Sequence, residues 1–547
     1  MHVASDFETF KRSIADAVER GDAESVREAI HPQARVMSEE HGIAFRELVA
    51  GLPVEVWHSD PRIAAAMGGS YRAQGSPRGQ SALGYFRAAE VAIAGSPDVP
   101  AHCVISVLLG HATALRNCGL LAQARVKVDE AEAMIETRLG SAVPMRIELG
   151  ARWSLEHGLI DLHEALFAIA RPHLEYARGH AASLTRAEHI ECLGALSVLD
   201  GSEGDLDRAL RQVAEARDLA EGTDLLETGF GAPALAAEVM VANERCDLEL
   251  AARLEPAMIE AGRRNEWEPF VHIVSAQLRA LEGHPVVALD VLKQAGQGYV
   301  GWDTHSIGMD FGGLMRAAVL TGLGQGDEAW AILQTLKPHD GHPLCPARVV
   351  AQLRLRHGDL VGADEAIRDC EALGDAHCGR TLVDIQLIRA TIELERGNYV
   401  VSDVNADRAL VTMARTGARA PLTRIPSGSL FTIATRARER RHRPDAQLMI
   451  TRILERTADA QGQVETLSPR ERLVLAQVQR GLTVAAIAAE LYISPNTVKT
   501  HLRRLYRKLG VTTREEAIRA ARSLGLEREI TRQSPGQYRD SLEEPVL

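Results

Sequence analysis

"LSPRERLVLAQVQRGLTVAAIAAELYISPNTVKTHLRRLYRKLGVTTREEAIRAARSLGL" (residues 467–526) is the stretch that decides the fold of the C-terminal part of the chain. Ser468, Pro469 and Glu471 have the order of a capping box with proline at the first helical position, so a helix should begin there. Apolar residues then recur at helical spacing up to Gly481, a residue type that commonly ends helices. The beginning of the stretch therefore predicts one short amphipathic helix.

Three more helices are predicted in the rest of the stretch. Thr483 should cap the second helix, and Ser494 should cap a third over residues 495–509. Thr512 opens another capping-box pattern, which predicts a fourth helix over residues 513–523. Because the second and third helices are separated only by a tight turn, they have the geometry that places a helix in the major groove of DNA.

The predicted helix over residues 495–509 has one apolar and one basic side. Residues near the start of such a recognition helix reach base edges, and basic residues further along lie against phosphates. We therefore expect base contacts from Lys499, Thr500 and Arg503. The expected phosphate contacts are Asn496, Thr497, Arg504, Arg507 and Lys508.

The stretch resembles the C-terminal four-helix DNA-binding domain of the LuxR/NarL-type bacterial transcription regulators. The matching residues are Leu467, Arg470-Glu471, Val474-Leu475, Gly481, Ile487-Ala488, Leu491, Ile493-Ser494, Thr497-Val498-Lys499, His501, Lys508-Leu509, Val511, Arg514 and Ala517. The resemblance implies that the fourth helix mediates dimerisation on DNA. The residues that would carry this contact are Arg514, Ile518, Ala521 and Arg522. Residues 483–486 (Thr-Val-Ala-Ala) depart from the family, which has polar and acidic residues there, and this puts a phosphate contact from the second helix in doubt.

Three ring side chains of this domain are interpreted as structural. His501 should pack against the first helix of the domain or cap its core, although it lies in the recognition helix. Tyr492 and Tyr506 should lie at the edges of the core, and we do not expect them to stack on bases.

The body of the chain before residue 460 is predicted to be all-α and repetitive. A Gly-x-x-x-x-Ala pattern opens successive amphipathic segments, at Gly119/Ala124, Gly204/Ala209, Gly283/Ala288, Gly324/Ala329 and Gly358/Ala363, with Gly397/Ser402 as a weaker copy. A glycine can end one helix in the left-handed conformation, and the small residue five positions later lets the next helix pack closely. The pattern resembles tetratricopeptide-like helical hairpins, although the spacing drifts, so another all-α array remains the alternative.

The N-terminal part resembles one class of large regulators. "GLPVEVWHSDPRIAAAMGGSYRAQG" (residues 51–75) is similar to the start of the helical region of large activators related to the maltose-regulon activator. No G-x-x-x-x-G-K-[ST] loop occurs, so the resemblance extends to their helical and DNA-binding parts without the ATPase domain. The predicted domains are a helical region over 1–90, an α-solenoid over 91–460, the helix-turn-helix domain over 463–530 and a mobile tail over 533–547. A break at Gln461-Gly462-Gln463 would separate the solenoid from the helix-turn-helix domain.

The charge distribution fits local nucleic-acid binding. The whole chain has a net charge of −12, but residues 465–532 contain 13 Lys and Arg against 7 Asp and Glu. A basic C-terminal module on an acidic body should bind DNA through that module alone.

Composition and motifs argue against several other classes of protein. The seven cysteines are scattered, which is typical of reduced thiols in a cytoplasmic protein, and we expect no secretory signal or membrane span. We expect no enzyme activity and no cofactor, because no catalytic motif occurs. His377-Cys378 near Cys370 is the closest metal-like grouping, and we expect no metal there.

The sequence thus predicts a transcription regulator that binds double-stranded DNA as a homodimer, with RNA polymerase as a candidate partner. Its helical body would receive an unidentified small-molecule or protein signal. One alternative is an interaction scaffold with a vestigial basic domain. Another is a sigma-like polymerase subunit, which the fourth helix argues against.

Overall fold

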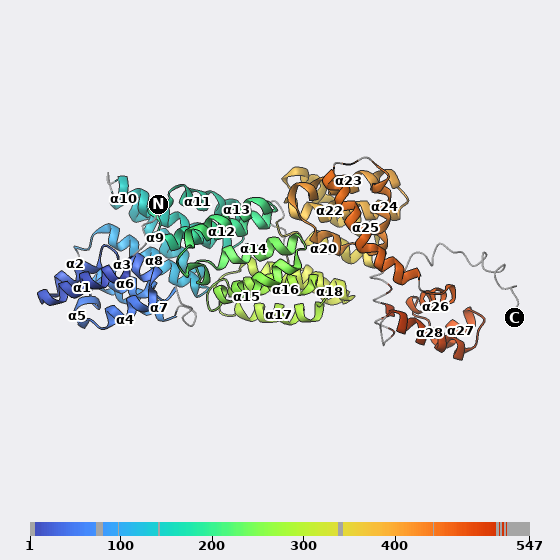
Figure 1. Cartoon of the computed structure of the whole chain (residues 1–547), viewed down its shortest axis with the longest axis horizontal. Coiled ribbons are helices and arrows are strands. Elements are labelled where there is room, and N and C mark those ends of the chain that lie inside the picture. The colour runs from blue at the N-terminus through green and yellow to red at the C-terminus, as the bar shows by residue number, and fades with distance from the viewer. Residues whose placement is uncertain are drawn as a thin grey trace. The chain divides into compact units, whose positions relative to one another are not determined.

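The protein is described by a computed structural model over residues 6–72, 80–96, 98–139, 143–336, 343–440, 442, 444–465, 467–509, 514, 517, 518 and 521. Among these residues every regular element is a helix and no strand occurs, as predicted (Figure 1). The chain divides into two compact units. Unit 1 is Met1–Val319, Ile332–Cys345 and Cys378–Arg380, and unit 2 is Leu320–Ala331, Pro346–His377 and Thr381–Leu547. No helix among the described residues has both the length and the apolar character that a membrane crossing needs.

The helices given below are those of the described residues, in chain order. The first ten are α1 (Phe7–Arg20), α2 (Ala23–Ile30), α3 (Ala34–Glu40), α4 (Gly42–Ala50), α5 (Val54–Trp57), α6 (Pro61–Gly69), α7 (Gln80–Ala94), α8 (Ala101–Asn117), α9 (Leu121–Arg138) and α10 (Val143–His163). The next nine are α11 (Phe167–Gly179), α12 (Arg186–Glu203), α13 (Leu206–Ala220), α14 (Ala232–Glu244), α15 (Leu248–Gly262), α16 (Glu268–Leu281), α17 (Pro285–Gly298), α18 (Ile307–Leu323) and α19 (Gly326–Leu333). The last nine are α20 (Pro346–Arg356), α21 (Leu360–Leu373), α22 (Gly379–Glu395), α23 (Tyr399–Thr416), α24 (Ser427–Arg438), α25 (Pro444–Glu465), α26 (Pro469–Gln479), α27 (Val484–Glu490) and α28 (Pro495–Leu509). Within the described part of the chain, 3-10 turns lie between them at η3 (Ala181–Ser183), η4 (Leu225–Glu227), η5 (Gly374–Ala376) and η6 (Ala420–Arg424).

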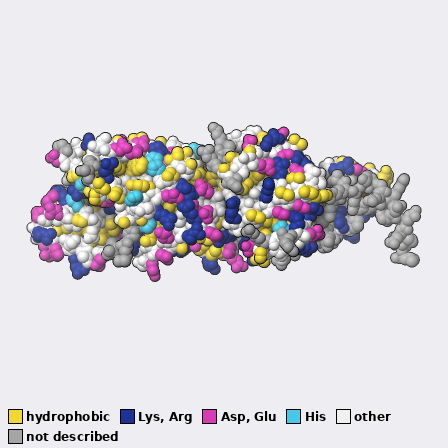
Figure 2. Space-filling model, turned by 90° about the horizontal axis from the view of Figure 1, so that it is seen from above, with side chains coloured by type: hydrophobic (Ala, Val, Ile, Leu, Met, Phe, Trp, Pro, Cys, Tyr) yellow, Lys and Arg dark blue, Asp and Glu magenta, His cyan; other side chains and the backbone are white. Residues whose placement is uncertain are grey.

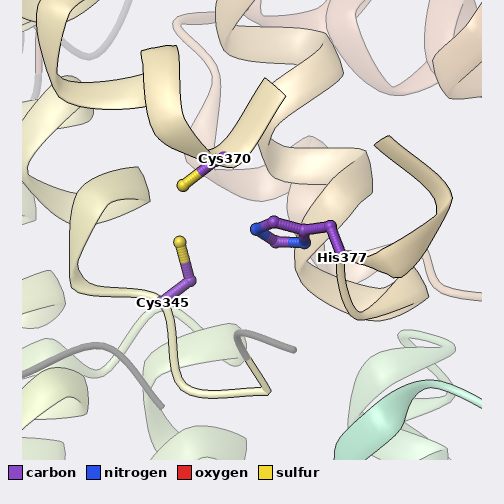
Figure 3. A group of neighbouring side chains, drawn as sticks. All are labelled: Cys345, Cys370 and His377. Carbon is purple, nitrogen blue, oxygen red and sulfur yellow. The ribbon is translucent and has the colours of Figure 1, made fainter. Parts of the chain in front are cut away.

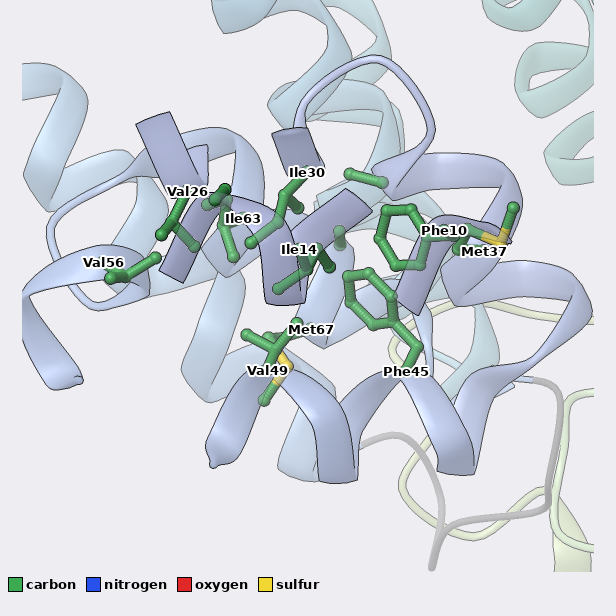
Figure 4. Packing of buried hydrophobic residues seen from close by; sticks show 13 residues of the cluster. Phe10, Ile14, Val26, Ile30, Met37, Phe45, Val49, Val56, Ile63 and Met67 are labelled. Carbon is green, nitrogen blue, oxygen red and sulfur yellow. The ribbon is translucent and has the colours of Figure 1, made fainter. Parts of the chain in front are cut away.

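The first six helices enclose a core of their own. Phe10 and Ile14 of α1 pack with Ile30 of α2, Phe45 of α4 and Ile63 of α6, and each of these side chains is almost fully buried (Figure 4). Burying a side chain of this size contributes about 1.5–3 kcal/mol. This cluster gives the N-terminal region a hydrophobic anchor before the helical pairs begin.

Consecutive helices then pack in pairs, and the predicted turn pattern is confirmed. In unit 1, α8 packs on α9, α10 on α11, α12 on α13, α14 on α15 and α16 on α17. The glycines of all six predicted Gly-x-x-x-x-small motifs have positive φ, between +74° and +96°. The small residue five positions later is 0% exposed in each of the five alanine motifs and 1% exposed at Ser402. The glycine therefore reverses the chain, and the small residue lets the next helix pack closely.

Two turns of the same kind were missed because they contain no glycine. Ala165 and Cys246 have φ of 64° and 54°, and Ala170 and Ala251, five residues later, are each 0% exposed. With these two, turns in the left-handed conformation recur from Gly119 to Gly397 at intervals of 34–46 residues. The repeat is therefore more regular than the glycines alone indicate.

The predicted boundary at Gln461-Gly462-Gln463 falls inside a helix, because α25 continues through these residues to Glu465. The boundary between the solenoid and the helix-turn-helix domain stays a prediction. A single glycine inside a helix costs only about 1 kcal/mol relative to alanine, which the neighbouring helical residues offset.

The residues of the metal-like grouping that the sequence singled out belong to different units. Figure 3 shows Cys370 and His377 of unit 2, whereas Cys345, the third labelled residue, belongs to unit 1. Cys378, which the sequence grouped with them, is also in unit 1, where its thiol donates to the carbonyl oxygens of Ser202 and Glu203 at 3.3 and 3.0 Å. On the face shown in Figure 2, acidic and basic side chains are interspersed.

Candidate nucleic-acid interface

The C-terminal domain begins with the predicted capping box. The Ser468 hydroxyl accepts a hydrogen bond from the Glu471 main-chain N–H at 3.3 Å, and the Glu471 carboxylate accepts one from the Ser468 N–H at 2.8 Å. α26 then runs from Pro469 to Gln479, and Gly481 follows with φ of +80°. The start and end of this helix are therefore fixed by the local sequence, as predicted.

α27 and α28 begin at the two predicted caps. The Thr483 hydroxyl accepts from the Ala486 N–H at 3.2 Å, and the Ser494 hydroxyl accepts from the Thr497 N–H at 3.1 Å. α28 spans Pro495–Leu509, which confirms the predicted bounds of the recognition helix. The turn between α27 and α28 contains Tyr492 in the left-handed conformation, with φ of 53°.

Two small hydrophobic clusters hold these helices together. One contains Val474, Val478, Ile487, Ala488 and Val498, and it joins α26, α27 and α28. The other contains Leu467, Leu475, Leu505 and Ala521. Because Val498 and Leu505 lie in these clusters, one side of α28 is fixed against the domain and the other faces outward.

The outward side of α28 carries the predicted contact residues. Lys499, Thr500 and Arg503, the predicted base contacts, are all exposed. The predicted phosphate contacts Asn496, Thr497 and Arg504 are exposed as well, whereas the side chains of Arg507 and Lys508 lie outside the described part of the chain. Within that part, no acidic side chain forms an ion pair with Lys499, Arg503 or Arg504. These cations are therefore available to a partner.

Two hydroxyls on α28 are already engaged. The Thr500 hydroxyl donates to the main-chain oxygen of Asn496 at 3.0 Å, so its hydrogen is engaged, whereas its oxygen can still accept a hydrogen bond. The Thr497 and Ser494 hydroxyls are 2.8 Å apart and stabilise the start of the helix.

Residues of the predicted fourth helix take part in the domain's own packing. Arg514 donates to the main-chain oxygens of Val478 and Leu482 at 3.1 and 2.6 Å. Ala521 is fully buried, and Ile518 packs on the cluster that joins α26, α27 and α28. Arg522 and the predicted Thr512–Glu515 capping box lie outside the described residues.

The three ring side chains differ in their surroundings. Tyr506 packs at the edge of a core cluster, as predicted, and His501 is half-buried. The prediction for Tyr492 is wrong, because this side chain is 95% exposed. The left-handed backbone at the turn points it away from the core, a feature that hydrophobic periodicity does not reveal.

The fold and the site together define a class of protein: an all-α chain of helical pairs with a C-terminal helix-turn-helix domain whose helix α28 exposes a basic side. Residues 465–521 match the family described as "Bacterial regulatory proteins, luxR family". The chain therefore carries a luxR-family domain at its C-terminus.

Three relatives bear the names of transcriptional regulators, and those of NarL and GfsR are qualified as probable. NarL of Mycobacterium tuberculosis is 56% identical over 55 residues, which are 10% of this chain and 26% of that protein. MalT of Serratia proteamaculans is 45% identical over 58 residues, 11% of this chain and 6% of that protein. GfsR of Streptomyces halstedii is 35% identical over 152 residues, 27% of this chain and 54% of that protein. The match to GfsR is longer than the part of the chain after residue 464, so it includes part of the helical body.

These matches cover only part of each relative, about a quarter of the length of NarL and about half of GfsR. Among solved structures, the Cut9-Hcn1 hetero-tetramer of the APC/C aligns with 92% of this chain and 96% of its own, at 12% identity and a TM-score of 0.38. A score this low does not establish a shared fold.

Proposed function

We propose that this protein is a sequence-specific transcriptional regulator that reads the major groove of DNA with α28. The observation that carries the proposal is the exposed side of this helix, where Lys499, Thr500 and Arg503 lie on a helix fixed by its opposite, buried side. Lys499 and Arg503 are one helical turn apart and so project from the same face. Both can donate to the O6 and N7 atoms of guanine.

Contacts to phosphates would supply most of the affinity. Asn496 and Thr497 lie in the first turn of α28, where the positive end of the helix dipole favours an anion, although the Thr497 N–H already donates to the Ser494 hydroxyl. The exposed Arg504 adds positive charge further along the helix. Arg507 and Lys508 follow it in the sequence and would add more. For each phosphate that the protein neutralises, the plot of the logarithm of the binding constant against the logarithm of salt concentration should be steeper by about 0.9.

The regulator would bind DNA as a homodimer through residues 513–523. Because Ala521 is buried and Arg514 caps α26, the contact would come from the remaining positions of this segment, with Arg522 as the leading candidate. Two α28 helices related by a two-fold axis would read half-sites about 10–10.5 base pairs apart.

The helical body would receive the signal that controls DNA binding in the cytoplasm. Helical pairs that recur along a chain create extended surfaces for proteins, peptides or small molecules. RNA polymerase is a candidate partner of the regulator.

The test measures equilibrium binding of the full-length protein to the DNA upstream of its own gene. Fluorescence anisotropy of labelled DNA reports the binding at several salt concentrations. Lys499→Ala/Arg503→Ala should weaken specific binding by about 1–3 kcal/mol for each lost base contact. The control is Arg211→Ala/Lys293→Ala, which removes the same charge from exposed positions of the body. Equal binding by the two double variants would contradict the proposal and favour the scaffold alternative.

A further inference from the structure

A cavity of about 70 Å³ lies within unit 1, bordered by α3, α6, α7, α8, α10 and α12. Phe86 forms part of its wall, and Gly68 and Gly110 approach the ring closely. A Cβ on either glycine would lie 2.7 or 2.6 Å from a ring carbon, so only glycine leaves room for the ring. The cavity has space for several waters or for one small polar molecule.

The charged groups that line the cavity are equal in number. Three are guanidinium groups, of Arg72, Arg152 and Arg264, and three are carboxyl groups, of Glu39, Glu156 and Glu188. Removing an unpaired charge from water costs several kcal/mol, so the buried groups among them need partners of opposite charge. When the ammonium group of a ligand holds Glu39 as the carboxylate, the six groups balance, and a ligand with no net charge keeps them balanced.

Most of these groups already have partners of opposite charge. The Arg152 Nε donates to Glu188 at 3.1 Å, and Glu156 accepts from the Nε of the buried Arg116 at 3.2 Å. Arg72 forms ion pairs with two buried carboxylates, Glu191 and Glu266. The partners come from helices far apart in sequence, so this network also fixes the cavity wall.

Three polar groups at the cavity are left with unused bonding capacity. Glu39 accepts a hydrogen bond from the Thr185 hydroxyl, but no guanidinium of the described residues lies within ion-pair distance of it. Arg72 is only 7% exposed, and its Nε has no hydrogen-bond partner. Arg264 is exposed at the rim, has no acidic partner among the described residues and has φ of 64°.

The surroundings of Glu39 also favour a cation beside its carboxyl group. Burial and the neighbouring Glu188 raise the pKa of Glu39 to about 8, even though Arg35 and Arg152 oppose this shift. The Glu39 carboxyl is therefore mostly protonated at neutral pH. An ammonium group beside it would favour the carboxylate and replace the missing counter-charge.

We propose that this cavity binds a small zwitterion, a free amino acid or a compound with the same charge pattern. Its ammonium would donate to Glu39, and its carboxylate would accept from the Arg72 Nε and from Arg264. The uncharged part would lie against Phe86. This inference rests on the proposed function in one respect, because it identifies the ligand as the signal that the body receives.

The test is calorimetric titration of the full-length protein, without DNA, with each of the common L-amino acids. At least one should bind, and its deaminated acid and decarboxylated amine should bind at least about tenfold more weakly, because each lacks one charge-assisted contact. Glu39→Gln and Arg264→Gln should each weaken binding by a similar factor. Glu19→Gln, at an exposed position of α1, is the matched control and should bind as the wild type does.

Three results would overturn the proposal: no heat from any amino acid at millimolar concentration, an amine or acid analogue that binds as tightly, or unchanged affinity in both variants. Circular dichroism checks that Glu39→Gln is folded, and the exposed Arg264 gives a second variant that leaves the buried network intact. Because DNA is absent, the result is independent of the proposed function. A protein that binds DNA but no amino acid refutes only the zwitterion site.

Discussion

The repeat turns make a quantitative prediction that two glycines of the same motif can test. Gly204 and Gly283 have φ of +96° and +87°. Alanine at either position should destabilise the folded protein by about 1–2 kcal/mol, because a residue with a Cβ is strained in the left-handed conformation. A Cβ at Gly283 would have no atom within 4 Å, whereas one at Gly204 would lie 2.5 Å from the main-chain nitrogen of Arg380. The two substitutions therefore differ mainly in a steric clash.

That clash cannot be relieved cheaply, because Arg380 is held on several sides. Its guanidinium donates to Ser202 O at 3.1 Å, to Glu244 at 3.2 Å and to Pro343 O at 2.7 Å. Overpacking of this kind costs about 1–3 kcal/mol. Gly204→Ala should therefore destabilise the protein by about 1–3 kcal/mol more than Gly283→Ala does.

Urea unfolding of the full-length variants, followed by circular dichroism, measures this difference as a shift in midpoint. Gly283→Ala should unfold slightly below the wild type, and Gly204→Ala at a clearly lower urea concentration. Hydrogen exchange in α12 and α13 should increase in the Gly204 variant. An equal midpoint for the two variants would refute the packing that we describe around Gly204.

Three further predictions concern the DNA-binding domain and the cavity. Arg514→Ala should remove hydrogen bonds worth about 1.5–3 kcal/mol at the end of α26 and speed hydrogen exchange there; unchanged exchange would mean that Arg514 acts only between subunits. Arg504→Ala should reduce the slope of the logarithm of the DNA-binding constant against the logarithm of salt concentration by about 0.9, without changing the preferred sequence. A changed sequence would mean that Arg504 contacts a base. Between pH 4.5, the ordinary pKa of this carboxyl, and about pH 8, Glu39 keeps its proton in the folded protein but has lost it in the unfolded chain. The stability of the folded state therefore falls as the pH rises through this range. Glu39→Gln should flatten that fall in melting temperature between pH 5 and 8, and an identical pH profile would contradict the raised pKa.

The helix-turn-helix domain was predictable because its signals are local. A capping box at Ser468 and caps at Thr483 and Ser494 act over three residues, and the structure contains all three. The glycine turns of the body were predictable for the same reason. Ala165 and Cys246 were missed because nothing in their residue types demands a left-handed backbone.

The buried ion network could not be predicted from the sequence. Arg116 pairs with Glu156, Glu191 and Glu266, which are 40, 75 and 150 residues away in the chain. Arginine and glutamate are also common on exposed helix faces, so their residue types alone favour the surface. Only the stacking of successive helical pairs brings these groups together around a cavity.

The central claim is that α28 reads a DNA sequence, and selection from a random duplex library by the full-length protein tests it most directly. The wild type should enrich a two-fold-symmetric sequence, and Lys499→Ala/Arg503→Ala should lose that preference while keeping salt-dependent binding to DNA in general. If the double variant enriches the same sequence as the wild type, or if the wild type enriches none, α28 does not read DNA as we propose.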